Sequence, residues 1–115
     1  MEWRTILNLN LNVPPDEEVT IENLETVRAI GGVYKIFDES NNLVYVGQSK
    51  NLARRIKEHF RNKRKGIFIH KVKFFYVHHE DVFVEESMRD MYETFLIRKL
   101  KPKYNKYQTA PMRYI

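Results

Sequence analysis

The sequence predicts a single α/β domain in which helices flank a small antiparallel sheet of three strands. Two short runs rich in β-branched and aromatic residues, 33–37 and 43–47, surround a DESNN segment whose residues favour turns. A third run of this kind follows at 72–79, and two other stretches carry apolar residues at helical spacing. The 115 residues are enough for one hydrophobic core and too few for a second catalytic domain.

Residues 1–28 are expected to form an N-terminal extension that covers the sheet or adds an edge strand to it. Apolar and polar residues alternate at 5–13, a pattern typical of a half-buried strand, which Pro14 and Pro15 end. The acidic stretch 16–30 carries apolar residues at partly helical spacing and favours a short helix or a covering segment. With six acids and two bases, residues 1–28 would make a poor DNA-binding arm.

The strands at 33–37 and 43–47 are predicted to form a hairpin. Apolar side chains fall on both of its faces, so helices should cover the sheet on both sides. The first helix is expected to start after Ser49, a suitable N-cap, and to end near Asn62. Its buried stripe recurs every four residues, at Leu52, Ile56 and Phe60.

A second and longer helix should follow the strand at 72–79. Asp81 is its expected N-cap, the stripe continues to Leu100, and Pro102 ends it. The apolar residues that define this helix are Val84, Met88, Met91, Tyr92, Phe95 and Leu96.

Composition limits the chemistry that the chain can support. The absence of cysteine excludes disulfides, thiolate metal sites and cysteine nucleophiles, so any metal must bind oxygen or imidazole ligands. The start of the sequence lacks a signal-peptide pattern, and no run of roughly eighteen apolar residues occurs, so we expect a cytoplasmic protein. The net charge is +5, and eight bases against one acid lie at 50–65. This cluster fits a nucleic-acid binder and a solvated helix face equally well.

Five residues are candidates for catalysis: the hairpin tyrosines Tyr34 and Tyr45, the pair Arg55 and His59, and Glu93. Each type is more often structural or solvated, but the four-residue spacing of Arg55 and His59 places them on one helical face beside the buried stripe. An arginine there can hold a phosphate. A carboxylate such as Glu93 suits Mg²⁺, which keeps several waters and shares its ligands with a substrate phosphate.

The motif residues resemble a known family. Gly32-Val33-Tyr34, followed by Tyr45-Val46-Gly47 and then by residues 48–55 and His59, is similar to the signature of the GIY-YIG nucleases. These nucleases include the nuclease subunit of bacterial nucleotide excision repair and phage homing endonucleases. The resemblance continues to Glu93 and Asn105 and spans about residues 31–107. Val33 and Val46 replace the isoleucines of the family name and keep their β-branched shape.

The resemblance implies a metal-dependent DNA endonuclease, active in DNA repair, recombination or mobile-element biology. Tyr34 and Tyr45 would line the site, and one of them would help deprotonate the attacking water. Which one does so is open, because a phenol needs a nearby cation or metal to act as a base at neutral pH. Arg55 would clamp the phosphate, and His59 matches a position where the family has a histidine or a tyrosine. As a hypothesis for the reaction, His59 is the proton relay. Glu93 would be the one protein ligand of Mg²⁺ or Mn²⁺, and Asn105 would order the site.

The predicted nuclease domain covers residues 29–107, with a basic and aromatic tail at 108–115. Gly47 is expected to allow a close backbone approach, and Gln48 and Lys50 to contact phosphates. The remaining candidate nucleic-acid contacts are the basic residues of the first helix and of the loop after it: Arg54, Lys57, Arg61, Lys63 and Arg64.

The sequence also suggests three other interpretations. His78-His79-Glu80 suggests a metal site of another nuclease type, but adjacent strand residues point to opposite faces and no suitable partner follows. A nucleic-acid-binding domain that has lost cleavage would have kept Tyr34 and Glu93 without use. A nuclease that acts only with a protein partner, or as a homodimer, is the third interpretation, since no separate DNA-binding module is evident.

Overall fold

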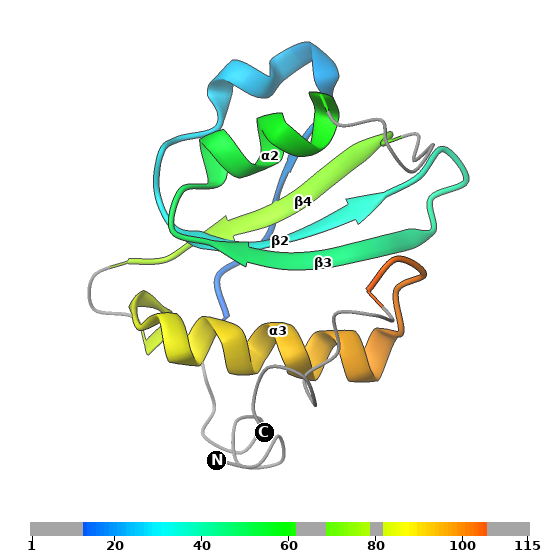
Figure 1. Cartoon of the computed structure of the whole chain (residues 1–115). Coiled ribbons are helices and arrows are strands. Elements are labelled where there is room, and N and C mark those ends of the chain that lie inside the picture. Colours follow the sequence, from blue (N-terminus) through cyan, green and yellow to red (C-terminus); the bar gives the residue numbers. More distant parts are fainter. Residues whose placement is uncertain (1–12, 62–68, 79–81, 106–115) are drawn as a thin grey trace.

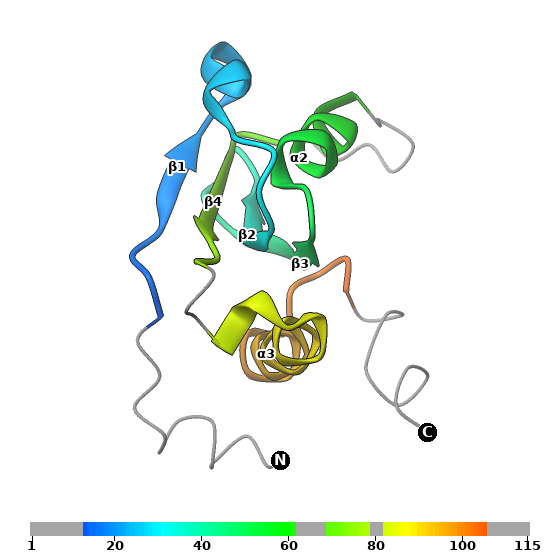
Figure 2. The ribbon, with the colours of Figure 1, turned by 90° about the vertical axis from the view of Figure 1, so that its left-hand side faces the viewer.

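The computed structural model describes residues 13–61, 69–78 and 82–105 (Figure 1). Four antiparallel strands form one sheet in the order β1-β4-β2-β3. The strands are β1 (Glu17–Val19), β2 (Gly32–Phe37), β3 (Leu43–Ser49) and β4 (Lys71–Tyr76), and the helices are α2 (Leu52–Arg61) and α3 (Glu86–Leu100), with 3₁₀ helices η1 (Ile21–Thr26) and η2 (Val82–Val84). Figure 2 shows α2 and α3 on opposite sides of the sheet, which confirms the predicted α/β class.

The predicted hairpin is confirmed as β2 and β3, which pair from Gly32 opposite Ser49 to Phe37 opposite Leu43. Asp38 closes the turn, because its carboxylate accepts hydrogen bonds from the backbone N–H groups of Ser40 and Asn42, both at 2.9 Å. This is the local bonding that makes aspartate a turn residue. The last strand of the prediction is also confirmed, although β4 ends at Tyr76 instead of continuing to 79.

The N-terminal extension does add an edge strand, but other residues form it than those predicted. β1 pairs with β4 through Glu17–Val19, within the stretch for which a helix or covering segment was predicted. The helical part of that stretch is only the 3₁₀ helix η1, which Thr20 caps. The helix predicted from the apolar spacing was therefore largely wrong, because pairing with the free edge of β4 outweighs a weak local pattern. Of the strand predicted at 5–13, residues 5–12 lie outside the described residues and Val13 belongs to no strand.

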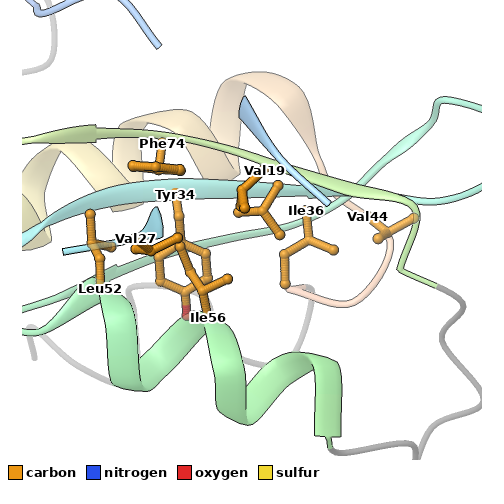
Figure 3. Packing of buried hydrophobic residues seen from close by; sticks show 9 residues of the cluster. Val19, Val27, Tyr34, Ile36, Val44, Leu52, Ile56 and Phe74 are labelled. Atoms are coloured by element: carbon orange, nitrogen blue, oxygen red, sulfur yellow. The ribbon is translucent and has the colours of Figure 1, made fainter. Parts of the chain in front are cut away.

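Alternating residues of the central strands build two apolar clusters, one on each face of the sheet. The cluster on the α2 side is shown in Figure 3 and contains Val19, Val27, Tyr34, Ile36, Val44, Leu52, Ile56, Val72 and Phe74. The cluster on the α3 side contains Val33, Val46, Phe75, Phe83, Phe95, Leu96 and Ile97. The apolar residues on both faces of the hairpin are therefore explained, since each face is covered by a helix.

The first helix has the predicted stripe but a different cap. Leu52 and Ile56 are buried and Phe60 packs against them. The side chain of Asn51, not that of Ser49, accepts a hydrogen bond from the backbone N–H of Arg54 at 3.1 Å, which is the N-cap interaction. Ser49 instead stabilises the turn before the helix, because its hydroxyl accepts a hydrogen bond from the backbone N–H of Asn51 at 3.0 Å. The prediction of Ser49 as the cap was wrong, because its hydroxyl orders the preceding turn.

The second helix begins later than predicted. Val82–Val84 form the separate 3₁₀ helix η2, and α3 starts at Glu86, while the expected cap Asp81 lies outside the described residues. The end of α3 agrees with the prediction. Lys101 adopts a left-handed conformation with φ 48°, and Pro102 follows it. Within the described residues, no helix is long and apolar enough to cross a membrane.

The segment after α3 returns to the edge strand β3. The N–H of Tyr104 donates to the carbonyl oxygen of Val44 at 2.9 Å. The amide side chain of Asn105 then binds both backbone groups of Val46, accepting from its N–H at 2.7 Å and donating to its carbonyl oxygen at 2.9 Å. Asn105 is 1% exposed. This segment therefore covers part of an edge that would otherwise present unpaired backbone groups.

We predict that Asn105→Ala lowers the free energy of unfolding by about 3 kcal/mol, because both backbone groups of Val46 would lose their partner in a buried place. Urea unfolding followed by circular dichroism measures this difference. The matched control is Asn42→Ala, since the side chain of Asn42 is exposed in the hairpin turn. Equal stabilities of the two variants would contradict the bracing role of Asn105.

Candidate active site

The candidate site is centred on Tyr34 and on the absence of a side chain opposite it. Tyr34 on β2 pairs directly with Gly47 on β3. A Cβ atom at Gly47 would overlap Cζ and the hydroxyl oxygen of Tyr34, so the aromatic ring lies against the bare backbone of β3. Tyr34 is 1% exposed, and Figure 3 shows its hydroxyl directed toward α2. The predicted close approach at Gly47 is thus to Tyr34 of the same chain.

Helix α2 brings His59 to the hydroxyl of Tyr34. The hydroxyl oxygen lies 2.7 Å from Nε2 of His59, within hydrogen-bond distance. Tyr45 completes a cluster of three rings, with centroid distances of 5.0 Å between Tyr45 and His59, 5.3 Å between Tyr34 and His59, and 6.1 Å between the tyrosines. Both predicted tyrosines and the predicted histidine therefore lie together, although 25 positions separate Tyr34 from His59.

Burial keeps both hydrogen-bonded groups neutral. It raises the pKa of Tyr34 far above its ordinary value, Tyr45 adds to this effect, and Arg55 opposes it. Burial also lowers the pKa of His59 to about 4, and the positive charge of Arg55 contributes in the same direction, against Glu58. At neutral pH the pair is consequently a protonated phenol and a neutral imidazole. With the imidazole proton on Nδ1, Tyr34 donates to Nε2 of His59.

Arg55 supplies the positive charge of the site. It lies one helical turn before His59 and close enough to Tyr34 for each group to shift the pKa of the other, and its guanidinium forms an ion pair of 3.1 Å with Glu58. The negative charge that Tyr34 carries when it is deprotonated is the main cause that raises the pKa of Arg55 above its already high value, although burial opposes the shift. The guanidinium remains partly exposed, so it is accessible to an anion from solvent.

Glu93 lies on the opposite face of the sheet from His59 and Arg55 (Figure 2). It lies on α3, is 6% exposed and contributes to raising the pKa of Tyr34, which indicates that its charge acts on the phenol. The candidate residues of the site therefore come from β2, β3, α2 and α3.

The donor set of the described residues fits a hydrated magnesium ion. These residues contain no group of three or more His, Cys, Asp or Glu side chains that could hold a metal. A structural or catalytic zinc site normally needs at least three protein ligands. Mg²⁺, in contrast, often binds one or two carboxylates and keeps its remaining waters. A single buried carboxylate such as Glu93 is compatible with that second arrangement.

The other predicted site residues occupy different surroundings. Lys50, Arg54 and Arg61 are exposed and Lys57 is partly exposed, all on or next to α2, whereas Lys63 and Arg64 lie outside the described residues. Asn105 contacts the backbone of β3 beside Tyr45 and Gly47, so it orders the strand that carries them.

Gln48 turns toward α3 instead of toward α2. Its amide nitrogen donates to Oδ1 of Asp90 at 2.7 Å, and its amide oxygen accepts from Nε of Arg89 at 3.0 Å. Sequence reasoning missed Arg89 and Asp90. The one available signal was that Arg89 precedes Glu93 by four residues and must share its helical face. Of the rejected motif, His78 is exposed beyond β4, and His79 and Glu80 lie outside the described residues.

Comparisons with known proteins found similar sequences. A family model described as the GIY-YIG catalytic domain matches residues 30–108. UvrABC system protein C of Shewanella baltica strain OS185 is 33% identical over 84 residues, which cover 71% of this chain and 14% of that protein. The same protein of Helicobacter pylori strain J99 is 33% identical over 98 residues, covering 74% and 16%. The chain thus spans about one seventh of the length of these relatives.

Solved structures show a similar fold. The GIY-YIG N-terminal endonuclease domain of UvrC from Thermotoga maritima bound to magnesium gives a TM-score of 0.57 with 21% sequence identity. The match covers 73% of this chain and 92% of that domain. A point mutant of the same domain, bound to its catalytic divalent cation, gives the same TM-score with 24% identity. At this level of identity the likeness concerns the fold.

We predict that Gly47→Ala displaces the ring of Tyr34 and lowers the free energy of unfolding by about 2 kcal/mol, as overpacking of a filled core does. A double-mutant cycle with Tyr34→Leu, followed by urea unfolding, tests the cause. In the Tyr34→Leu background the added methyl group should cost much less. A cost that is the same in both backgrounds would show that Tyr34 is not what excludes a side chain at position 47.

We predict that His59 makes stability fall with decreasing pH. The unfolded chain binds a proton at His59 near pH 6.5, whereas the folded protein does so only near pH 4, so the unfolded state gains protons first as the pH falls between these values. The stabilisation present above pH 6.5 is therefore lost toward pH 4. Urea unfolding at several pH values should give a shallower slope for His59→Gln. Parallel curves for the two proteins would contradict the burial of a neutral His59.

Proposed function

The chain belongs to the GIY-YIG family, and from this premise we propose that it is an endonuclease that hydrolyses phosphodiester bonds in DNA with the help of one divalent metal ion. The observation that carries the proposal is the hydrogen bond of 2.7 Å between Tyr34 and His59, with Arg55 beside it. A buried phenol with a neutral base on one side and a cation on the other is suited to proton transfer.

Tyr34 is the group that deprotonates the attacking water in this proposal. As its oxygen takes a proton from the water, its own proton moves to Nε2 of His59, which is neutral because burial lowers the pKa of His59 to about 4. The hydroxide then attacks phosphorus, the bond from phosphorus to the leaving oxygen breaks, and that oxygen takes a proton from solvent. Tyr45 packs against the His59 ring and helps to hold it in place.

Arg55 binds the phosphate that is attacked. Its guanidinium is partly exposed and already next to Tyr34, so a phosphate bound to it would lie close to the phenol. Two of its N–H groups can bind two phosphate oxygens at once and stabilise the negative charge that grows on them. The ion pair with Glu58 would hold the side chain in position until the substrate arrives.

Glu93 would hold the divalent ion through its carboxylate, and the burial of this side chain on α3 supports the proposal. A bound Mg²⁺, or Mn²⁺ in its place, would supply positive charge to the phosphate oxygens and help to orient the scissile bond. Asn105 contributes indirectly, since it holds the backbone of β3 at Val46, between Tyr45 and Gly47.

The basic residues on α2 give the protein its attraction for DNA. Arg54, Lys57 and Arg61 line the solvent side of this helix, and Lys50 precedes it, so these side chains can follow the phosphates on either side of the cleaved bond. Lys63 and Arg64 extend the same basic segment in the sequence. Contacts of this kind bind the backbone without reading the bases.

DNA repair is the process that we favour, because the curated relatives named above are UvrABC system proteins of bacteria. Such an enzyme would act in the cytoplasm, where bacterial DNA lies. A protein partner or a second copy of the chain is part of the proposal for cleavage of both strands, since one site of this kind cuts one strand at a time. The alternative is a binding domain that does not cleave.

We predict metal-dependent cleavage of supercoiled plasmid by the purified protein in Mg²⁺, with loss of cleavage in EDTA. Glu93→Gln keeps the shape of the side chain and removes its charge, and Arg55→Met removes the phosphate clamp. Each should reduce the initial rate by at least about 100-fold, as expected when one stabilising group is lost. Gel analysis of nicked and linear DNA measures the rate.

The matched control is Glu86→Gln, an exposed carboxylate on the same helix as Glu93, which should cleave like the wild type. Cleavage that survives Glu93→Gln with an unchanged metal requirement would overturn the proposal. Failure to cleave plasmid, branched or damaged DNA, together with DNA binding that is intact in Glu93→Gln, would favour the binding domain instead.

A further inference from the structure

A buried arginine links three elements on the α3 side of the sheet. Arg89 is only 5% exposed. Its Nε donates to the side-chain oxygen of Gln48 on β3 at 3.0 Å, and one terminal nitrogen donates to the carbonyl oxygens of Phe83 at 2.9 Å and Val84 at 2.7 Å. Gln48 in turn donates to Asp90 at 2.7 Å, so β3 and α3 are tied together by two side-chain hydrogen bonds.

Burial of a guanidinium is costly unless its N–H groups are bound. Its planar fork fixes the directions of those bonds, so the three acceptors must occupy definite places around it. Arg89 therefore sets both how η2 leads into α3 and where the first turns of α3 lie along β3. This also explains why α3 starts only at Glu86, since the carbonyl groups of Phe83 and Val84 are turned to Arg89.

The link lies directly beside the candidate site. Gln48 follows Gly47, against which the ring of Tyr34 packs. Glu93 follows Arg89 by four residues, so the two side chains occupy one helical face in successive turns, and both are buried. A connection from the backbone of Gly47 to α3 thus runs through Gln48 and Arg89, and Glu93 lies one turn further along the same helix.

The apolar contacts of α3 with the sheet have no fixed direction, so directed hydrogen bonds add to what sets its register. Val33 and Val46 on the sheet pack against Phe95, Leu96 and Ile97, and such contacts resist separation more than they resist a small slide along the strand. Directed hydrogen bonds from a planar group do resist that slide. A ligand to a metal must be placed within a few tenths of an ångström to be effective.

We propose that Arg89 and Gln48 are positioning residues that hold the carboxylate of Glu93 in register with β3 for binding of the divalent ion. This inference rests on the proposed metal-dependent function, but it concerns metal binding in the absence of DNA. Loss of the link would weaken binding of the ion to folded protein, and neither Arg89 nor Gln48 would need to touch the ion or the substrate.

The test is a titration of the 115-residue protein with Mn²⁺ without DNA, in which electron paramagnetic resonance reports the free ion. Arg89→Met and Gln48→Leu remove the hydrogen bonds while keeping similar volumes. Each should raise the dissociation constant for Mn²⁺ about tenfold, the size of effect seen when groups behind a metal ligand are lost. Arg89→Lys keeps the charge without the planar fork and should not restore wild-type affinity. Glu86→Gln is the matched control and should bind like the wild type.

Circular dichroism of each variant at the titration temperature ensures that only folded protein is compared. If Arg89→Met does not fold, the Mn²⁺ affinity of Gln48→Leu alone tests the positioning role. Wild-type Mn²⁺ affinity in folded Gln48→Leu, or in Arg89→Lys, would overturn the inference, as would a wild-type protein that binds no Mn²⁺. A failure of the nuclease proposal would give a different result. A protein that binds Mn²⁺ through Glu93 but cleaves no DNA would refute the nuclease while leaving the positioning role supported by the same titration.

Discussion

The packing of the Tyr34 ring on the bare backbone of Gly47 is the constraint on which the rest of the site depends. It requires the register of β2 and β3 that places these two residues opposite each other. It also removes the phenol from water, and this burial is the main cause of its raised pKa. The hydroxyl of Tyr34 is directed toward α2, so the residues that can interact with it, His59 and Arg55, lie on that helix. A signature glycine and tyrosine are thus two parts of one contact.

An edge strand is a poor support for such a contact unless other parts of the chain hold it. Among the strands of the described residues, β3 has a neighbour on one side only. On the other side Asn105 binds both backbone groups of Val46, and on the α3 face Gln48 is bound to Arg89 and Asp90. Catalytic groups tolerate very small errors in position. Buried polar side chains with fully directed bonds supply the rigidity that apolar packing alone does not.

The sequence predicts those parts of the structure that local patterns determine. The hairpin and the stripes of α2 and α3 follow from periodicity and turn residues, and the grouping of Tyr34 with His59 follows from spacing together with the family resemblance. What it did not predict depends on contacts between distant residues. β1 forms because β4 has a free edge, and α3 starts late because Arg89 binds the carbonyl groups before it. A buried arginine and a solvated one look alike in the sequence, so the structural role of Arg89 could not be predicted.

In the proposed mechanism Arg55 affects the proton transfer between Tyr34 and His59 as well as the bound phosphate. In the proposed transfer an imidazolium forms at His59 while the oxygen of Tyr34 gives up its own proton and takes one from water, and burial opposes the charge that develops on both groups. The cation of Arg55 favours negative charge on Tyr34 and disfavours the imidazolium, so it leaves His59 neutral in the resting protein. A phosphate bound to Arg55 would offset part of that positive charge, which makes the imidazolium easier to form and negative charge on Tyr34 harder to form. Binding of the substrate would therefore change the balance between the two halves of the proton transfer.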